Sequence, residues 1–289
     1  MIAPLLLALL ALAPRPAAPA FVPTPDPRPT IPAMRIHLPV LVILPIKPST
    51  TRVPATRPTA ARMALRPTNS AGLRLALLVP GAFVEPAPGE YRDHGQFRVA
   101  AGVTLDGRGA VQLLGFGLRL DRAEGAVIRG VTISGSTTDA IEILHTRTAT
   151  VEHVNLSDTG DGLLDVIRVA GPGGLILVRD SILHDDDKCS LLGHFDPAGD
   201  EQLRVRFERV QFIRCGARTP KVHRARVELV DTLIADWRSR AVDVQLGGHV
   251  SLTRTRFEAG RQSGARIRLE SGGTVAESGT QYVSWEGAE

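Results

Sequence analysis

The chain has 289 residues, of which 43% are apolar and only 4% aromatic, and its formal net charge is +4. So few aromatic side chains argue against a platform on which nucleic-acid bases stack. Residues 1–70 carry eight Arg or Lys and one Asp, a net +7, which leaves −3 for residues 71–289. The basic balance therefore belongs to the N-terminal stretch, and we expect no nucleic-acid partner.

The first residues have the composition of a targeting segment. Met1–Ala13 is an apolar run that is too short to span a bilayer, and small residues follow it at Ala18–Ala20. This order is typical of a secretory signal peptide, although no Lys or Arg precedes the apolar run. We predict a signal peptide over residues 1–20 and a secreted protein, with an unstructured N-terminus as the alternative.

Proline dominates the next segment, because 15 of the 21 prolines lie before residue 70. Proline removes backbone donors, and no periodic apolar face accompanies it. Residues 21–72 are therefore predicted to be a basic, disordered linker. Residues 73–289 are predicted to form the single folded domain, with no membrane span.

Short segments of alternating apolar and polar residues recur from residue 100 onward, and each ends in a large apolar residue. The spacings between these closing residues are 23, 27, 29, 22 and 23. A repeat of 20–30 residues without helical periodicity is typical of a parallel β-helix or a related solenoid, here of roughly eight to nine coils. The closing residues are Ile133, Leu156, Leu183, Phe212, Ile234 and Phe257.

Two other repeating or all-β folds fit the pattern less well. An antiparallel sandwich would need hairpin turns about every 8–12 residues and no fixed long period. A leucine-rich repeat would need its LxxLxLxxN pattern, which is absent from the sequence. We therefore predict an all-β chain folded as a parallel β-helix.

The two cysteines, Cys189 and Cys215, are 26 residues apart, which is about one coil. In a secreted protein they could form a disulfide. They could equally be two small buried core residues. The spacing leaves both interpretations open.

Five charged residues recur at spacings close to one repeat. Asp139 and Asp161 are 22 residues apart, Asp165 and Lys188 are 23 apart, and Arg218 follows Lys188 by 30. In a solenoid such residues approach one another, because neighbouring strands are about 4.8 Å apart. Three clustered carboxylates repel one another unless a cation neutralises them, and a hard ion such as calcium suits oxygen ligands. The alternative is that these are ordinary acidic residues of turns.

Several blocks of sequence, in this order, resemble the pectate lyases of polysaccharide lyase family 1. They extend over more than half of the chain, which is more specific than any one motif. The blocks are VTLDGRGA (103–110), GFGLRL (115–120), AVIRGVTI (126–133), DAIEI (139–143), DGLLDV (161–166), HDDDKCSLLGH (184–194) and CGARTP (215–220).

The resemblance implies a right-handed, single-stranded parallel β-helix. It also implies a monomeric enzyme that cleaves de-esterified homogalacturonan (polygalacturonate, pectate) by β-elimination to 4,5-unsaturated oligogalacturonides. By position, Asp139, Asp161 and Asp165 match the family's Ca²⁺ ligands. Lys188 matches a lysine that holds a substrate carboxylate, and Arg218 matches the arginine assigned as catalytic base. An arginine base is unusual, since a guanidinium normally stays charged.

The chain departs from the family pattern near that base. Where the family has R-x-P-x-x-R, this sequence has His223 in place of the second arginine, with Arg224 beside it. We therefore expect His223 and Arg224 to contribute to substrate binding. Most of the asparagines that stack inside the family's coils are also missing. These changes leave open a non-catalytic β-helix that binds a polysaccharide or a surface. A pectin lyase fits less well, because a methylated substrate needs no acidic calcium site.

Overall fold

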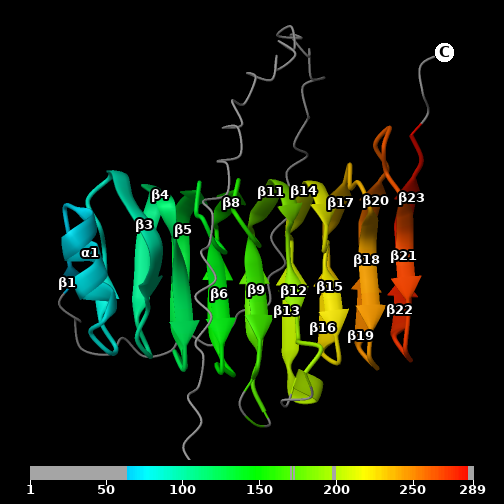
Figure 1. Ribbon diagram of the computed structural model, residues 1–289, viewed down its shortest axis with the longest axis horizontal. Helices are drawn as coiled ribbons and strands as arrows, with labels where there is room; N and C mark the ends of the chain where they lie inside the picture. Colours follow the sequence, from blue (N-terminus) through cyan, green and yellow to red (C-terminus); the bar gives the residue numbers. More distant parts are fainter. Residues whose placement is uncertain (1–63, 170, 172, 197–199, 286–289) are drawn as a thin grey trace, which may run out of the picture. The chain divides into compact units, whose positions relative to one another are not determined.

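The computed structural model describes residues 64–285, except residues 170, 172 and 197–199. The predicted signal peptide and most of the predicted linker lie outside these residues. Within the described ranges, no helix has the length and apolar character needed to cross a bilayer. The described chain forms a parallel β-solenoid of about nine turns, which confirms the predicted fold (Figure 1).

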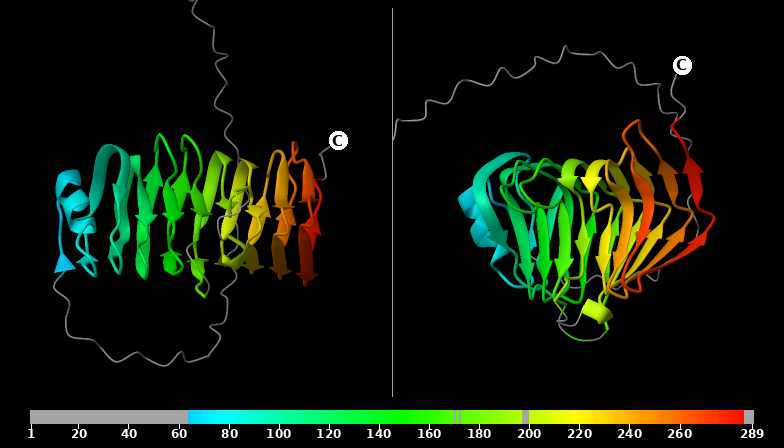
Figure 2. Two further views of the ribbon diagram at one scale, coloured as in Figure 1. Left: turned by 60° about the horizontal axis from the view of Figure 1, so that its bottom comes forward. Right: turned by 45° about the vertical axis from the view of Figure 1, so that its right-hand side comes forward.

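Each coil contributes strands to three parallel sheets, here called sheets I, II and III (Figure 2). Sheet I contains β1 (Ala64–Leu65), β2 (Phe83–Val84), the starts of β4 (Thr104–Asp121) and β5 (Ala126–Ser134), β7 (Ala149–Glu152), β10 (Ile176–Arg179), β13 (Arg204–Glu208), β16 (Arg226–Val230), β19 (His249–Thr253) and β22 (Thr274–Ser278). Sheet II contains the start of β3 (Gly89–Arg98), the middle of β4, the end of β5, β8 (Asn155–Ser157), β11 (Ile182–Lys188), β14 (Gln211–Ala217), β17 (Leu233–Ala235), β20 (Arg256–Glu258) and β23 (Gln281–Val283). Sheet III contains the ends of β3 and β4, β6 (Ile141–Leu144), β9 (Leu164–Ile167), β12 (Leu191–Leu192), β15 (Lys221–His223), β18 (Arg240–Gln245) and β21 (Ala265–Leu269).

The closing apolar residues of the sequence repeat pair directly with one another along sheet II. Ile133 pairs with Leu156, and Leu156 pairs with Leu183. Leu183 in turn pairs with Phe212, and the same register continues to Phe257. All of these side chains are fully buried, so the repeat marks one continuous apolar column. This column fixes the register in which the polar residues between the strands stack.

The solenoid begins earlier than the predicted domain boundary at residue 73. Strand β1 pairs in parallel with β2, and helix α1 (Ser70–Leu77) follows with Asn69 as its N-cap. Leu73 and Leu77 are fully buried, because residues four apart lie on one face of a helix. Residues 64–72, assigned to the linker from their proline content, are therefore part of the folded unit.

Charged residues occupy many of the bends between sheets I and II. Asp180, Arg209, Asp231 and Arg254 all have positive φ angles of 48–53°. Arg209 donates to Asp180 at 2.6 Å, and Arg254 donates to Asp231 at 2.6 Å. Ion pairs between coils therefore link these bends.

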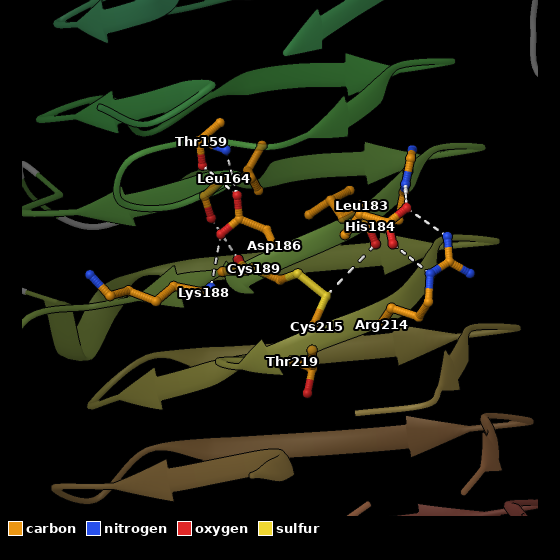
Figure 3. Close-up of a disulfide and its surroundings, with 12 residues drawn as sticks. Thr159, Leu164, Leu183, His184, Asp186, Lys188, Cys189, Arg214, Cys215 and Thr219 are labelled. Atoms are coloured by element: carbon orange, nitrogen blue, oxygen red, sulfur yellow. Dashed lines mark hydrogen bonds and ion pairs between the residues drawn. A yellow bond between two sulfur atoms is a disulfide. The ribbon is translucent and has the colours of Figure 1, made fainter. Parts of the chain in front are cut away.

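The two cysteines form a disulfide, which decides between the two interpretations left open by the sequence (Figure 3). Their Cα atoms are 5.8 Å apart, and both residues are buried. Cys189 directly follows Lys188, while Cys215 lies three residues before Arg218. The disulfide therefore joins the two consecutive coils that carry these predicted site residues.

Candidate functional site

The predicted site residues lie where the chain passes from sheet II to sheet III. Asp139 lies just before β6, and Asp165 lies within β9. Lys188 ends β11, and Arg218 follows the end of β14. The bends of successive coils stack because the strands on either side are in register. Residues up to 53 positions apart, such as Asp165 and Arg218, are therefore neighbours.

Asp139 and Asp165 form the centre of the site, on either side of Gly162. A Cβ atom placed on Gly162 would lie 2.8 Å from Oδ1 of both aspartates. The two Oδ1 atoms of Asp139 and Asp165 are therefore separated by at most twice 2.8 Å. The absence of a side chain at Gly162 thus leaves a cradle between two carboxylates, and the chain bends at the adjacent residues Asp161 and Leu163.

Both carboxylates are in an environment that opposes their charge. Burial and the negative charge of Asp161 raise the pKa of Asp139. Burial and the negative charge of Asp139 raise the pKa of Asp165, although Oδ1 of Asp165 accepts a hydrogen bond from the Leu191 N–H at 2.8 Å. Among the described residues, Oδ1 of Asp139 is buried without a hydrogen-bond partner. Such a pair is stabilised as dianion only by added positive charge.

The cations of the site face these carboxylates. The Lys188 ammonium donates to Asp161 at 2.8 Å, and both side chains are about half exposed. The Arg218 guanidinium lies 3.5 Å from Asp165 Oδ2 and 3.9 Å from Asp161 Oδ1. The structure thus brings together four of the predicted residues, and the fifth, Asp139, lies next to Asp165 at Gly162. The four are Asp161, Asp165, Lys188 and Arg218.

The carboxylates of the site supply part of what a calcium ion needs. Calcium holds oxygens at about 2.3–2.6 Å, so oxygens on either side of one ion lie within about 5 Å of each other. The Oδ1 atoms of Asp139 and Asp165 lie at most twice 2.8 Å apart around the Gly162 cradle, so a small inward shift of the two side chains would bring them to this separation. Asp161 does not complete the set as it stands, because it pairs with Lys188. Accordingly, the described part of the chain has no group of three or more His, Cys, Asp or Glu side chains that could hold a metal. Of the three predicted ligands, Asp139 and Asp165 are therefore placed to share a cation, and Asp161 is not.

His223 and Arg224 lie apart from this cluster. His223 is 7% exposed, and neither of its ring nitrogens has a hydrogen-bond partner among the described residues. Burial, and then the nearby charge of Lys221, lower its pKa, which disfavours the protonated form that would hold a carboxylate. Arg224 instead pairs with Glu201 at 3.2 Å. The geometry gives no support to either residue as a free substrate cation.

A cavity of about 500 Å³ adjoins the aspartates. Two charged residues that line it, Arg119 and Glu142, were not predicted as site residues from the sequence, and they form an ion pair at 3.0 Å. The register explains their place, because Glu142 pairs with Asp165 in sheet III. The cavity is lined by Gln96, Arg119, Thr137, Thr138, Asp139, Glu142, Gly160, Asp161 and Lys188.

Comparison with known sequences finds relatives but no matching family model. Probable pectate lyase A of Aspergillus fumigatus is 30% identical over 141 residues, which cover 44% of this chain and 43% of that protein. Pectate lyase plyB of Emericella nidulans is 29% identical over 196 residues, which cover 62% of this chain and 59% of that protein. The chain thus spans about half the length of the curated relatives that it matches.

Comparison with solved structures also finds pectate lyases. A pectate lyase bound to a hexasaccharide superimposes with a TM-score of 0.64 at 14% identity. The match covers 76% of this chain and 80% of that one, and at this identity it shows a shared fold. By sequence and by fold, the chain is therefore a relative of the pectate lyases, as its ordered motif blocks predict.

Proposed function

We propose that the chain is a secreted, monomeric, calcium-dependent pectate lyase that cleaves de-esterified homogalacturonan by β-elimination. The observation that carries this proposal is the convergence of Asp139, Asp165 and Arg218 from three coils of a fold shared with pectate lyases. The relatives' names support the same activity. Calcium would supply positive charge that links the aspartates to a uronate carboxylate and acidifies the adjacent C–H bond.

In the proposed reaction, Arg218 takes the proton from C5 of a galacturonate unit. The electron pair of that C–H bond forms the C4–C5 double bond, and the C4–O bond breaks with its electrons on the leaving sugar oxygen. A base role needs the neutral guanidine. A cation held by Asp165 would compete for the carboxylate charge that now faces the Arg218 guanidinium at 3.5 Å.

Lys188 is proposed to hold the substrate carboxylate next to the reacting carbon. In the structure its ammonium is bound to Asp161 at 2.8 Å. A uronate carboxylate could replace that partner once Asp161 turns to the cation. Lys188 then stabilises negative charge that develops beside C5 in the transition state.

The decisive experiment measures ultraviolet absorbance of unsaturated uronides released from polygalacturonate. We expect absorbance with calcium, none after chelation, and recovery on adding calcium back. Arg218→Ala should lower kcat by about 10²–10⁴-fold, the usual contribution of a general base. An absence of unsaturated product from any uronate polymer would refute the proposal.

A non-catalytic polysaccharide-binding protein is the second candidate. Two observations favour it: Lys188 is already neutralised by Asp161, and His223 is buried. It predicts retention of the protein on a polygalacturonate affinity gel, with the length of the polymer unchanged. Shortening of the polymer under the same conditions would exclude this candidate.

A further inference from the structure

The exposed face of sheet III carries a row of charged residues that continues beyond the candidate site. Asp165 lies next to Leu191 in the register, because their neighbours Val166 and Leu192 are paired. Leu191 pairs with Lys221, and Lys221 pairs with Asp243. Side chains at these positions point to the same face, since each is in register with the next. Lys221 therefore lies on the face of Asp165, two strands and roughly 10 Å away.

Lys221 is a partly exposed cation whose neighbours do not neutralise it. Its register partner, Asp243, lies 3.9 Å from Arg240, 3.8 Å from Arg268 and within hydrogen-bonding distance of the Gln245 amide, at 3.0 Å. Among the described residues, no carboxylate lies within 4.0 Å of the Lys221 ammonium. The acid beside Lys221 thus already contacts two arginines and an amide, which leaves the ammonium available to a ligand.

The neighbouring titratable residue on the same strand does not compete for an anion. His223 shares the outward side of β15 with Lys221, because the residue between them, Val222, is fully buried in the core. His223 itself is buried and lies apart from any partner among the described residues. Lys221 is the cation that strand β15 offers on the outer face of sheet III.

We propose that Lys221 binds a second free carboxylate of an acidic polysaccharide, one sugar position away from the carboxylate held near Lys188 and Arg218. This inference rests on the proposed function, and it deepens it by assigning a subsite that selects for de-esterified sugar. A methyl ester has no charge to pair with the ammonium, so each esterified unit at this position loses a charge-assisted hydrogen bond.

The test compares Lys221→Gln with Lys221→Arg and with the matched control Arg226→Gln. Arg226 is an exposed cation of the same coil, but it lies in sheet I and not on the face of Asp165 and Lys221. KM and kcat are measured with calcium on polygalacturonate and on highly methyl-esterified pectin. For Lys221→Gln we expect KM on polygalacturonate to rise about tenfold with kcat within about twofold, the loss expected for one charged hydrogen bond.

Preference for de-esterified over esterified polymer should fall by the same factor in Lys221→Gln. Lys221→Arg should retain most of it, and Arg226→Gln should change neither quantity. An unchanged KM and preference in an active Lys221→Gln enzyme would overturn this inference alone. If the wild-type chain neither cleaves nor binds uronate polymers, the proposed function fails, and the subsite fails with it.

Discussion

The Lys188 ammonium donates to Asp161 at 2.8 Å, so a predicted substrate cation and a predicted metal ligand neutralise each other. Asp161 cannot serve a cation fully while it holds Lys188. The first prediction is that Asp161→Asn raises the calcium concentration for half-maximal activity by about tenfold or more, because one anionic ligand is lost. At saturating calcium, activity should recover substantially.

A calcium titration of the initial rate checks this expectation. Asp158→Asn is the matched control, since Asp158 is an acid of the same loop with a positive φ of 53° that asparagine tolerates. An equal calcium dependence in wild type and Asp161→Asn would remove Asp161 from the metal site.

The second prediction concerns the cradle at Gly162. Gly162→Ala would place a methyl group 2.8 Å from both Asp139 and Asp165, which forces the carboxylates apart. We expect calcium affinity to fall while the circular dichroism spectrum stays unchanged, because the change is confined to a bend. Binding is measured by calorimetry with calcium alone, in the absence of substrate.

The control for this variant is Gly72→Ala, in helix α1, where the added methyl would come no closer than 3.3 Å to any neighbour. It should bind calcium as the wild type does. Unaltered calcium affinity in Gly162→Ala would show that the two aspartates do not form the site.

The third prediction concerns the Cys189–Cys215 disulfide. Replacing both cysteines by alanine should lower the free energy of unfolding by about 2–4 kcal/mol, since a cross-link within a loop of this size limits the unfolded chain. Urea unfolding of wild type and variant measures this difference. The variant should also lose activity at temperatures where it is still folded, because the disulfide joins the coils of Lys188 and Arg218.

A loss of stability without any loss of activity would separate the disulfide from the site. The wild-type protein treated with a reductant provides the comparison, and it should match the double variant. A reduced wild type that is fully stable and active would contradict the prediction.

The fourth prediction is a pH dependence that arises from His223. Its pKa is lowered in the folded protein by burial, so the unfolded chain binds the proton more readily. Below the unfolded value of about 6.5, protonation of His223 therefore favours unfolding, and its contribution to stability falls as the pH falls. The raised pKa values of Asp139 and Asp165 act in the opposite direction over this range, so the comparison between two proteins carries the prediction. Between pH 7.5 and pH 5.5, the free energy of unfolding in urea should change more favourably for His223→Gln than for wild type.

The same change in both proteins would mean that His223 does not contribute to the pH dependence. A change that is more favourable for wild type than for His223→Gln would reverse the sign and place His223 beside an anion. That outcome would return it to the list of substrate-binding candidates.

The fold could be predicted from the sequence because its period is carried by residues such as Leu183 and Phe212, which truly pair. The spacing between the closing apolar residues equals the number of residues between paired positions in sheet II. The start of the fold was predicted too late, because Ala64–Leu65 is too short a strand to show alternation next to prolines. The ion pairs of the bends were also missed, since no periodic apolar signal marks them.

The site was only partly predictable for a related reason. The spacing of 23 residues suggested that Asp165 stacks on Lys188. The register neighbour of Asp165 is instead Leu191, so these two charged residues are not paired along the sheet. Which cation meets which carboxylate depends on side-chain reach, which spacing does not encode. The burial of His223 and the free ammonium of Lys221 likewise become visible only when the strand faces are known.

The bends between the sheets have one more consequence. Arg209 reaches back one coil to Asp180, and Arg254 reaches back one coil to Asp231. Deletion of the coil that carries Arg209 would set Asp180 against Asp231, and deletion of the coil that carries Asp231 would set Arg209 against Arg254. Two features therefore favour the observed order of the coils: the apolar column of sheet II, and the alternation of acidic and basic residues along the bends between sheets I and II. Duplication or deletion of two consecutive coils in this region would keep opposite charges next to one another, whereas a change of one coil would not.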